Sequence, residues 1–352
     1  MSNSSGLGAR VQGHLDDFLA GRRELLAAMG PETEPLLDEA ATAVAGGKRL
    51  RPAFCVAGWQ AAGGDPDDDR VLHAAASLEL LQASALVHDD LIDGSDTRRG
   101  RPSVHRGFEQ RHRDAGWSGE PDRFGSGAAL LLGDLLLTWS HEMLRGCGLD
   151  PATVDRAAPW FDACTSEVTT GQYLDLVAQA TATADEDVAL RVIRYKSASY
   201  TVVRPLHLGA ALGGGDDTLL TGLTAYGSPV GVAFQLRDDV LGVFGDPGQT
   251  GKPAGDDLRE GKRTVLLART ATRAGAEGRT LLDRLVGDPD LDPAGLRRLR
   301  ELIVGCGALA SMEQTIAELE TEALSALDSL PIGADVHERL TTLAEAALQR
   351  SR

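Results

Sequence analysis

Apolar positions recur along most of the chain at spacings of three and four, the period that places side chains on one face of an α-helix. Alternating runs of β-branched residues, which are typical of strands, are scarce. We therefore expect an all-α protein whose helices are separated by short turns. The predicted helices span residues 11–29, 34–45, 50–62, 70–92, 128–146, 151–180, 185–212, 217–243, 262–275, 278–286, 293–306 and 309–328.

Two stretches interrupt this helical pattern. The segment HRGFEQRHRDAGWSGEPDRFGSG, residues 105–127, is polar and rich in glycine, so we expect one long loop there. The stretch GDPGQTGKPAGDD, residues 245–257, also breaks the pattern. Neither reads as a linker between domains, and no repeat of fixed period is evident. The prediction is a single domain over residues 1–352.

Composition supports a helical core and argues against several classes of protein. The 352 residues are 42% hydrophobic but only 4% aromatic, and alanine and leucine, both strong helix formers, dominate. A net charge of −17 repels nucleic acid and anionic lipid. The longest apolar stretch, GAALLLGDLLLTW, carries Asp134 and is too short to span a bilayer. The first residues lack a secretory signal, so we expect a cytoplasmic protein without stable membrane insertion.

An apolar helix ends on a dense group of carboxylates in VHDDLIDGSDTRRGRPSVH, which starts at Val87. Asp89 and Asp93 are four positions apart and share a helix face, while Asp90 lies about a quarter-turn away. Like charges at that spacing repel, and a hard cation such as Mg²⁺ would offset the repulsion and bind phosphate oxygens of a substrate. The alternative is a solvated helix end, which the apolar residues before Asp89 disfavour.

A second acidic pair, Asp238 and Asp239, lies in GVAFQLRDDVLGVFGD at residues 231–246. Two such pairs that face one another across a helical bundle would hold a multinuclear Mg²⁺ site. The alternative is two unrelated helix ends. Acids at a helix C-terminus oppose the helix dipole, so the same chance placement twice is disfavoured.

Three basic groups accompany the acids: GGKRLRP at 46–52, TRRGRP at 97–102 and GKPAGDDLREGK at 251–262. Glycines let the backbone approach an anion, and arginine binds phosphate in a bidentate manner. The third group is not a nucleotide P-loop, because Pro253 follows Lys252 and Asp246 stands where a glycine is needed. Each group alone would indicate a surface patch. Together with the acidic clusters they indicate a substrate that carries diphosphate.

The motifs resemble those of the trans-isoprenyl diphosphate synthases, also called polyprenyl synthetases, over roughly residues 40–330. Five motifs stand in the order of that family, which makes the resemblance specific. They are GGKRLRP, DDLID at 89–93, GQYLDL at 171–176, YKSASYTVVRPL at 195–206 and FQLRDD at 234–239. The resemblance implies an all-α, single-domain isoprenoid-synthase bundle around a deep central cavity, usually as a homodimer.

The resemblance also implies roles for individual residues. Those that would bind Mg²⁺, about three ions per active site, are Asp89, Asp90, Asp93, Asp238 and Asp239. Those that would bind the diphosphate of isopentenyl diphosphate are Lys48, Arg51, Gln82 and Arg99. Those that would bind the diphosphate of the allylic substrate are Arg98, Lys196, Ser197, Gln235, Lys252 and Lys262. Asp89, Asp93, Asp238 and Lys196 would be catalytic.

One departure from the family pattern concerns the second aspartate-rich motif, whose last acid is replaced by Gly242. Asp238 then remains its main metal ligand, and we expect activity to be retained. The implied reaction is electrostatic: cations draw charge from the leaving diphosphate, and the allylic C–O bond ionises. The alkene of isopentenyl diphosphate attacks the carbocation, and a proton is lost to the departing diphosphate.

Product length is expected to depend on the residues just before the first acid. By resemblance, bulky aromatics at these positions close the tunnel in synthases that stop at C15, whereas here they are Ser84 and Ala85. Leu81, one helical turn deeper than Ala85, is the candidate floor. From C5, C10 or C15 primers we expect mainly geranylgeranyl diphosphate, C20, with some C15. The alternative is that both residues are small because a neighbouring helix packs closely.

Other functions remain open at this point. The product could be farnesyl diphosphate or a longer chain. A class I terpene cyclase uses the same metal clusters, but this chain has few aromatics and keeps GGKRLRP, which a cyclase would not need. A non-catalytic subunit of a heteromeric synthase could lose its metal ligands, whereas both aspartate pairs are intact here.

Overall fold

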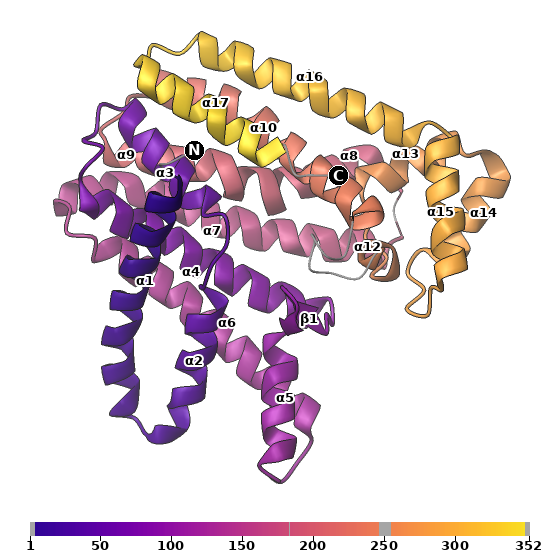
Figure 1. Ribbon diagram of the computed structural model, residues 1–352, viewed down its shortest axis with the longest axis horizontal. Coiled ribbons are helices and arrows are strands. Elements are labelled where there is room, and N and C mark those ends of the chain that lie inside the picture. The colour runs from indigo at the N-terminus through magenta and orange to yellow at the C-terminus, as the bar shows by residue number, and fades with distance from the viewer. Residues whose placement is uncertain (1–3, 183, 246–254, 349–352) are drawn as a thin grey trace. The chain divides into compact units, whose positions relative to one another are not determined.

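The computed structural model describes residues 4–182, 184–245 and 255–348, and their regular structure is almost entirely helical (Figure 1). The expected all-α class is therefore confirmed. The strands described are the short antiparallel pair β1 (Thr97–Arg98) and β2 (Arg101–Pro102). The chain forms two compact units, one of residues 1–162 with 205–220 and the other of residues 163–204 with 221–352. The expectation of a single domain stays a prediction.

Unit 1 is built around the long helix α4 (Asp69–Ile92), which packs against α6 (Pro121–Arg145), α3 (Leu50–Ala61) and α1 (Ser4–Ala27). Its core consists largely of leucine and alanine, as the sequence predicts; Leu80 and Leu132 are wholly buried. The other elements of this unit are η1 (Pro31–Thr33), α2 (Glu34–Ala43), α5 (Val104–Asp114), α9 (Arg204–Leu212) and the first parts of α7 (Pro151–Ala180) and α10 (Asp217–Phe244).

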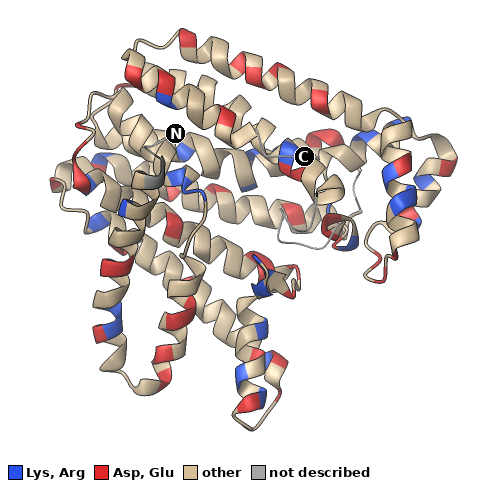
Figure 2. Ribbon diagram, viewed as in Figure 1, with Lys and Arg blue, Asp and Glu red and all other residues tan. Residues whose placement is uncertain are grey.

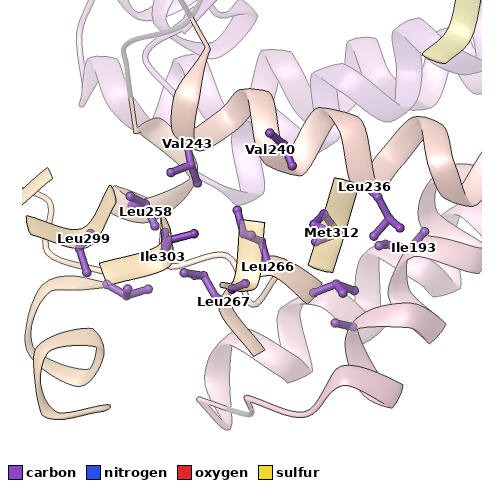
Figure 3. Close-up of a cluster of buried hydrophobic side chains, with 14 of the residues drawn as sticks. Ile193, Leu236, Val240, Val243, Leu258, Leu266, Leu267, Leu299, Ile303 and Met312 are labelled. Carbon is purple, nitrogen blue, oxygen red and sulfur yellow. The ribbon is translucent and has the colours of Figure 1, made fainter. Parts of the chain in front are cut away.

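Unit 2 has its own core, which Figure 3 shows in close-up. Leu236 and Val240 of α10 meet Leu266, Ile303 and Met312 from helices later in the chain, and all five are at most 6% exposed. The elements of this unit are the remainder of α7 and α10 with α8 (Glu186–Val192), η2 (Ile193–Val203), α12 (Asp256–Arg259), α13 (Val265–Arg273), α14 (Gly275–Leu285), α15 (Pro293–Gly305), α16 (Ala308–Asp328) and α17 (Ala334–Leu348).

The prediction of one long loop at residues 105–127 is wrong. Residues 104–114 form α5, and α6 begins at 121. Phe108 and His112 are buried on one face of α5, and Phe124 packs against the His112 ring at a centroid distance of 5.3 Å. The segment contains many arginines and histidines, so the four-residue spacing of Phe108 and His112 is not evident from the sequence. Their burial against α6 stabilises the helix in spite of its polar composition.

The helix predicted over 185–212 is interrupted. Residues 193–203, between α8 and α9, form the π-helix η2, whose i→i+5 hydrogen bonds make it wider than an α-helix. The terminal helix α17 was not predicted. In the described residues no single helix is both long and apolar enough to cross a membrane; α15 and α16, bent by 61° at their junction, meet that requirement only as a pair.

Candidate functional site

The first acidic cluster ends helix α4. The side chain of Asp68 caps its N-terminus by accepting a hydrogen bond from the amide of Arg70, and Asp93 is its C-terminal cap. Within the last turn, Asp90 is only 2% exposed. Arg98 of β1 binds it with two donors: Nε donates to the two carboxylate oxygens at 2.9 and 3.0 Å, and Nη2 donates to Oδ1. The same guanidinium lies 3.5 Å from Oδ2 of Asp89, so part of the acidic charge is balanced within unit 1 (Figure 2).

A tight hairpin turn directs the two neighbouring arginines to different partners. Arg99 and Gly100 both have positive φ, 53° and 72°, as a two-residue type I′ turn requires. The turn returns Arg98 to α4, whereas Nη1 of Arg99 donates to the carbonyl of Ala45 at 3.0 Å. The sequence predicts a basic group at TRRGRP but not this division between the acidic cluster and the GGKRLRP loop.

The GGKRLRP loop is held by a buried arginine that sequence reasoning did not single out. Arg49 has φ 51° and is 6% exposed. Its guanidinium donates to Glu79 of α4 and, at 2.7 Å, to the carbonyl of Val44. This anchor leaves Lys48 exposed and Arg51 half-buried at the start of α3. The structure thus brings Lys48 and Arg99, both predicted to bind isopentenyl diphosphate, onto adjoining loops of unit 1.

The remaining predicted residues of unit 1 lie along α4. Gln82 is half-buried. Leu81 is 2% exposed, and the hydroxyl of Ser84 donates to the carbonyl of Gly133 in α6 at 2.8 Å. Ser84 therefore lies where α4 packs closely against α6, and this agrees with the alternative that the residue is small because a neighbouring helix is near. Ala85 is half-buried, whereas Ser84 is buried against α6, so Ala85 is the stronger tunnel candidate of the two.

In unit 2, the π-helix η2 carries Lys196 and Ser197. The ammonium of Lys196 donates to Oδ2 of Asp175 on α7 at 2.6 Å. Two glycines admit the wide backbone: a Cβ at Gly171 would lie 2.6 Å from Cα of Lys196, and one at Gly231 would lie 2.7 Å from Cα of Ala198. Real Cβ atoms do not approach so closely, so both positions require glycine.

The far end of η2 is fixed by Glu167, which sequence reasoning also missed. Its Oε2 accepts from the hydroxyl of Ser199 at 2.5 Å and from Nε of Arg204 at 2.9 Å. Because Ser199 lies within the π-helix and Arg204 caps its C-terminus, one carboxylate ties the π-helix to α7. Short π-helical segments often occur at functional sites, where they place side chains that a regular helix would direct elsewhere.

The second acidic cluster lies in the last two turns of α10. Asp238 is half-buried, and Asp239 is 5% exposed with Oδ1 accepting from Nε2 of Gln235 at 2.9 Å. Burial, with smaller contributions from Asp257 and Asp238, raises the pKa of Asp239 to about 8. Lys262 opposes this shift in pKa, and its Nζ lies 2.7 Å from Glu260. Lys252, also predicted to bind the allylic diphosphate, lies outside the described residues.

The two clusters suit Mg²⁺ by the chemistry of their donors. Within the described ranges, no three His, Cys, Asp or Glu side chains are already gathered as a metal site. The donors present are carboxylates, the ligands that Mg²⁺ prefers. In unit 2, burial and, to a smaller extent, neighbouring acids raise the pKa of Asp239, and a nearby cation would stabilise its charged form.

Comparison with known proteins identifies the family. The polyprenyl synthetase family matches residues 34–303. The chain belongs to the polyprenyl synthetase family. Among curated members, a geranylgeranyl diphosphate synthase of Saccharolobus solfataricus is 32% identical over 315 residues, which cover 88% of each chain. A (2E,6E)-farnesyl diphosphate synthase of Mycobacterium bovis is 35% identical and covers 74% of this chain and 67% of its own.

Solved structures of polyprenyl synthetases agree with this assignment. A geranylgeranyl pyrophosphate synthase from Corynebacterium glutamicum, in complex with isoprenyl diphosphate and magnesium, is 41% identical with a TM-score of 0.94. The match covers 98% of this chain and 99% of that one. A polyprenyl synthase from Caulobacter crescentus, complexed with calcium and isoprenyl diphosphate, is 30% identical with a TM-score of 0.75 and covers 98% of each chain. The family predicted from the motifs is confirmed, whereas the roles of individual residues stay predictions.

Proposed function

We propose that the protein is a Mg²⁺-dependent prenyltransferase that condenses isopentenyl diphosphate with allylic diphosphates and makes mainly geranylgeranyl diphosphate, C20. The observation that carries this proposal is the match to the Corynebacterium glutamicum geranylgeranyl pyrophosphate synthase over 98% of the chain. The chain also keeps basic residues for two diphosphates: Lys48, Arg51 and Arg99 for one, and Arg98, Lys196 and Lys262 for the other. A farnesyl diphosphate synthase is the second candidate, favoured by the relative from Mycobacterium bovis.

The roles proposed for the side chains follow from their charge and position. Asp89 and Asp93 hold two Mg²⁺ ions and Asp238 holds a third, with Asp90 and Asp239 beside them. Bound Mg²⁺ supplies positive charge that stabilises the leaving diphosphate. Arg98, Lys196, Ser197, Gln235, Lys252 and Lys262 orient the allylic diphosphate, and Lys48, Arg51, Gln82 and Arg99 orient that of isopentenyl diphosphate.

Ion pairs hold two of these cations in defined positions. Asp175 holds Lys196, and Asp90 holds Arg98. A charged side chain that is already oriented loses less conformational freedom when it binds phosphate than a mobile one does. The apolar side chains of α4, Leu81 and Ala85 among them, would then accept the growing hydrocarbon and exclude water from the carbocation.

We also propose a cytoplasmic homodimer. Leu130 and Leu131 of α6 are 50% and 61% exposed, an adjacent apolar pair that a second copy could cover. The proposed function is tested separately by incubating purified protein with Mg²⁺, isopentenyl diphosphate and a C15 primer. A synthase makes a longer linear diphosphate and consumes isopentenyl diphosphate. A cyclic hydrocarbon would instead indicate a terpene cyclase, and no reaction would indicate a non-catalytic subunit.

A further inference from the structure

The N-terminal helix α1 reaches the GGKRLRP loop through a glutamine. Gln12 lies on α1, and its Oε1 accepts a hydrogen bond from Nη2 of Arg49, the buried arginine of that loop. Gly8, one helical turn earlier, lies on the same face of α1, and a Cβ there would be 3.9 Å from Cγ of Arg49. Helix α1 therefore covers the side chain of Arg49, although it precedes residues 34–303, which match the family.

The amide of Gln12 has a defined orientation. Its Nε2 donates to Oδ1 of Asp16, on the next turn of α1, at 2.8 Å. A guanidinium can only donate and an ionised carboxylate can only accept, so the amide oxygen must face Arg49 and the amide nitrogen must face Asp16. With another of its nitrogens, Arg49 donates to Glu79 of α4. A continuous chain of hydrogen bonds thus runs from α1 through the loop to α4.

Arg49 depends on these partners because of its own conformation and burial. Its φ of 51° lies in the left-handed region, which a residue with a Cβ adopts at a cost in energy. Its guanidinium is buried, which is costly unless its donors are matched. The two hydrogens of Nη2 have two acceptors, Gln12 and the carbonyl of Val44. Without Gln12 one N–H loses its acceptor, and this favours loop conformations in which water reaches it.

The residues around Arg49 are those proposed to bind isopentenyl diphosphate. Lys48 precedes it, and Arg51 follows two positions later. The carbonyl of Ala45, just before the loop, accepts a hydrogen bond from Arg99 at 3.0 Å. A change in the backbone of the loop would therefore displace three cations together.

We propose that Gln12 is a positioning residue for the isopentenyl diphosphate site, and that α1 sets the geometry of the GGKRLRP loop through the contact of Gln12 with Arg49. Gln12 acts through Arg49 and not by contact with the substrate. This inference rests on the proposed function, which assigns Lys48, Arg51 and Arg99 to that diphosphate.

The proposal is tested by steady-state kinetics of Gln12→Ala in the full chain, with Mg²⁺, isopentenyl diphosphate and a C15 primer. The KM for isopentenyl diphosphate should rise at least about fivefold, while kcat and the KM for the primer stay within about twofold of wild type. The primer should be unaffected because Lys196, assigned to its diphosphate, is held by Asp175 in unit 2 and has no part in this chain of hydrogen bonds.

A matched control is Gln110→Ala. Gln110 is exposed on α5 in the same unit and makes the same bond within its helix, from Nε2 to Oδ1 of Asp114 at 2.7 Å. Within the described ranges no hydrogen bond joins its side chain to the GGKRLRP loop. The control therefore removes an equivalent helix contact without disturbing Arg49, and both KM values should stay at those of wild type.

A second variant tests whether the hydrogen bond itself is the cause. Q12E/D16N exchanges the carboxylate and the amide: the acid at position 12 still accepts from Arg49, and the amide at position 16 donates to it. The KM for isopentenyl diphosphate should return to within about twofold of wild type. Gln12→Met, which keeps the length of the side chain but has no oxygen acceptor, replaces Gln12→Ala if circular dichroism shows that variant to be unfolded, and should raise the same KM.

The possible outcomes separate this proposal from the one on which it rests. If Lys48→Ala raises the KM for isopentenyl diphosphate and folded Gln12→Ala and Gln12→Met do not, the role of Gln12 is refuted and the proposed site stands. Equal rises in both KM values, or no recovery in Q12E/D16N, would also refute positioning through Arg49. If Lys48→Ala leaves this KM unchanged, the assignment of the loop to isopentenyl diphosphate fails, and the inference fails with it.

Discussion

The two acidic clusters look alike in sequence, yet their surroundings differ. In unit 1, Asp90 is buried against Arg98, which also approaches Asp89, so the cluster carries its own counter-charge. In unit 2, Asp239 is buried beside Asp238 and Asp257, and its pKa is raised to about 8. Part of the charge of the first cluster is balanced without metal, whereas the second cluster gains more from a cation.

This difference shows that a shared sequence pattern does not fix the electrostatic state of a site. The hairpin β1–β2 returns an arginine to the first cluster within eight residues of Asp90. The second cluster instead receives another acid, Asp257, where the motif has Gly242. We expect the first cluster to be preorganised for substrate and the second to depend more strongly on Mg²⁺.

The largest expected effect is loss of turnover in Asp89→Ala. Removal of one group that stabilises charge in the transition state typically costs about 3–4 kcal/mol, a factor of a hundred to a thousand in rate. The variant should stay folded, since it removes one of several like charges at the end of α4. Steady-state kinetics with circular dichroism checks both points. Near-normal turnover would take Asp89 out of the mechanism, and an unfolded variant would make its role structural.

A second comparison separates the two diphosphate sites. Lys48→Ala should raise the KM for isopentenyl diphosphate more than the KM for the primer, and Lys196→Ala should do the reverse. Each charge-assisted contact is worth roughly 1.5–3 kcal/mol, or about ten- to 150-fold in affinity. Initial rates with each substrate varied in turn give both constants. Equal changes in the two KM values for either variant would break the assignment of one basic group to each substrate.

When metal is removed by a chelator, neutralising one acid should change the free energy of unfolding differently in the two clusters. Asp90→Asn takes the charge partner of Arg98 from a buried site and should cost about 1–3 kcal/mol. Asp239→Asn should cost nothing or slightly stabilise the protein. The folded pKa of Asp239, about 8, exceeds the ordinary value of 3.8, so its contribution to stability is present below pH 4 and lost as pH rises toward 8.

The gain from Asp239→Asn relative to wild type should therefore grow between about pH 4 and pH 8 and then level off. Urea unfolding at several pH values measures it. A loss of stability in Asp239→Asn at pH 8 as large as that in Asp90→Asn would contradict the proposed contrast between the clusters.

The smallest expected effect on rate, but a clear one on product, comes from Ala85→Phe. By the proposed tunnel along α4, a ring at this position should shorten the product to C15 or below while ionisation continues. Leu81→Ala should lengthen the product, because Leu81 is the proposed floor. Ser84→Ala serves as a control, since the hydroxyl of Ser84 bonds to Gly133. A folded, active Ala85→Phe that still makes C20 would show that the tunnel does not pass residue 85.

Much of the fold could be predicted from apolar periodicity because most helices bury one face. The helix expected at 70–92 was observed at 69–92, and its acidic end was found from the sequence alone. The loop predicted at 105–127 failed because charged residues outnumber the few buried aromatics of α5. The π-helix η2 was missed since its cause is tertiary: it depends on Gly171 and Gly231 meeting its backbone.

In the site, too, features that depend on tertiary contacts could not be predicted from the sequence. The motifs located Asp89, Asp238 and the basic groups, because spacing along one helix carries that information. Glu79 and Glu167 were missed, because each acts on a residue distant in sequence.

A short-chain prenyltransferase that makes C20 is tested by the chain lengths formed from C5, C10 and C15 primers with labelled isopentenyl diphosphate and Mg²⁺. The account predicts that all three primers yield mainly geranylgeranyl diphosphate with some C15 intermediate, and that omission of Mg²⁺ stops the reaction. Accumulation of C15 with no conversion of a C15 primer would contradict the C20 product. Absence of any elongated diphosphate from all three primers would contradict the prenyltransferase activity itself.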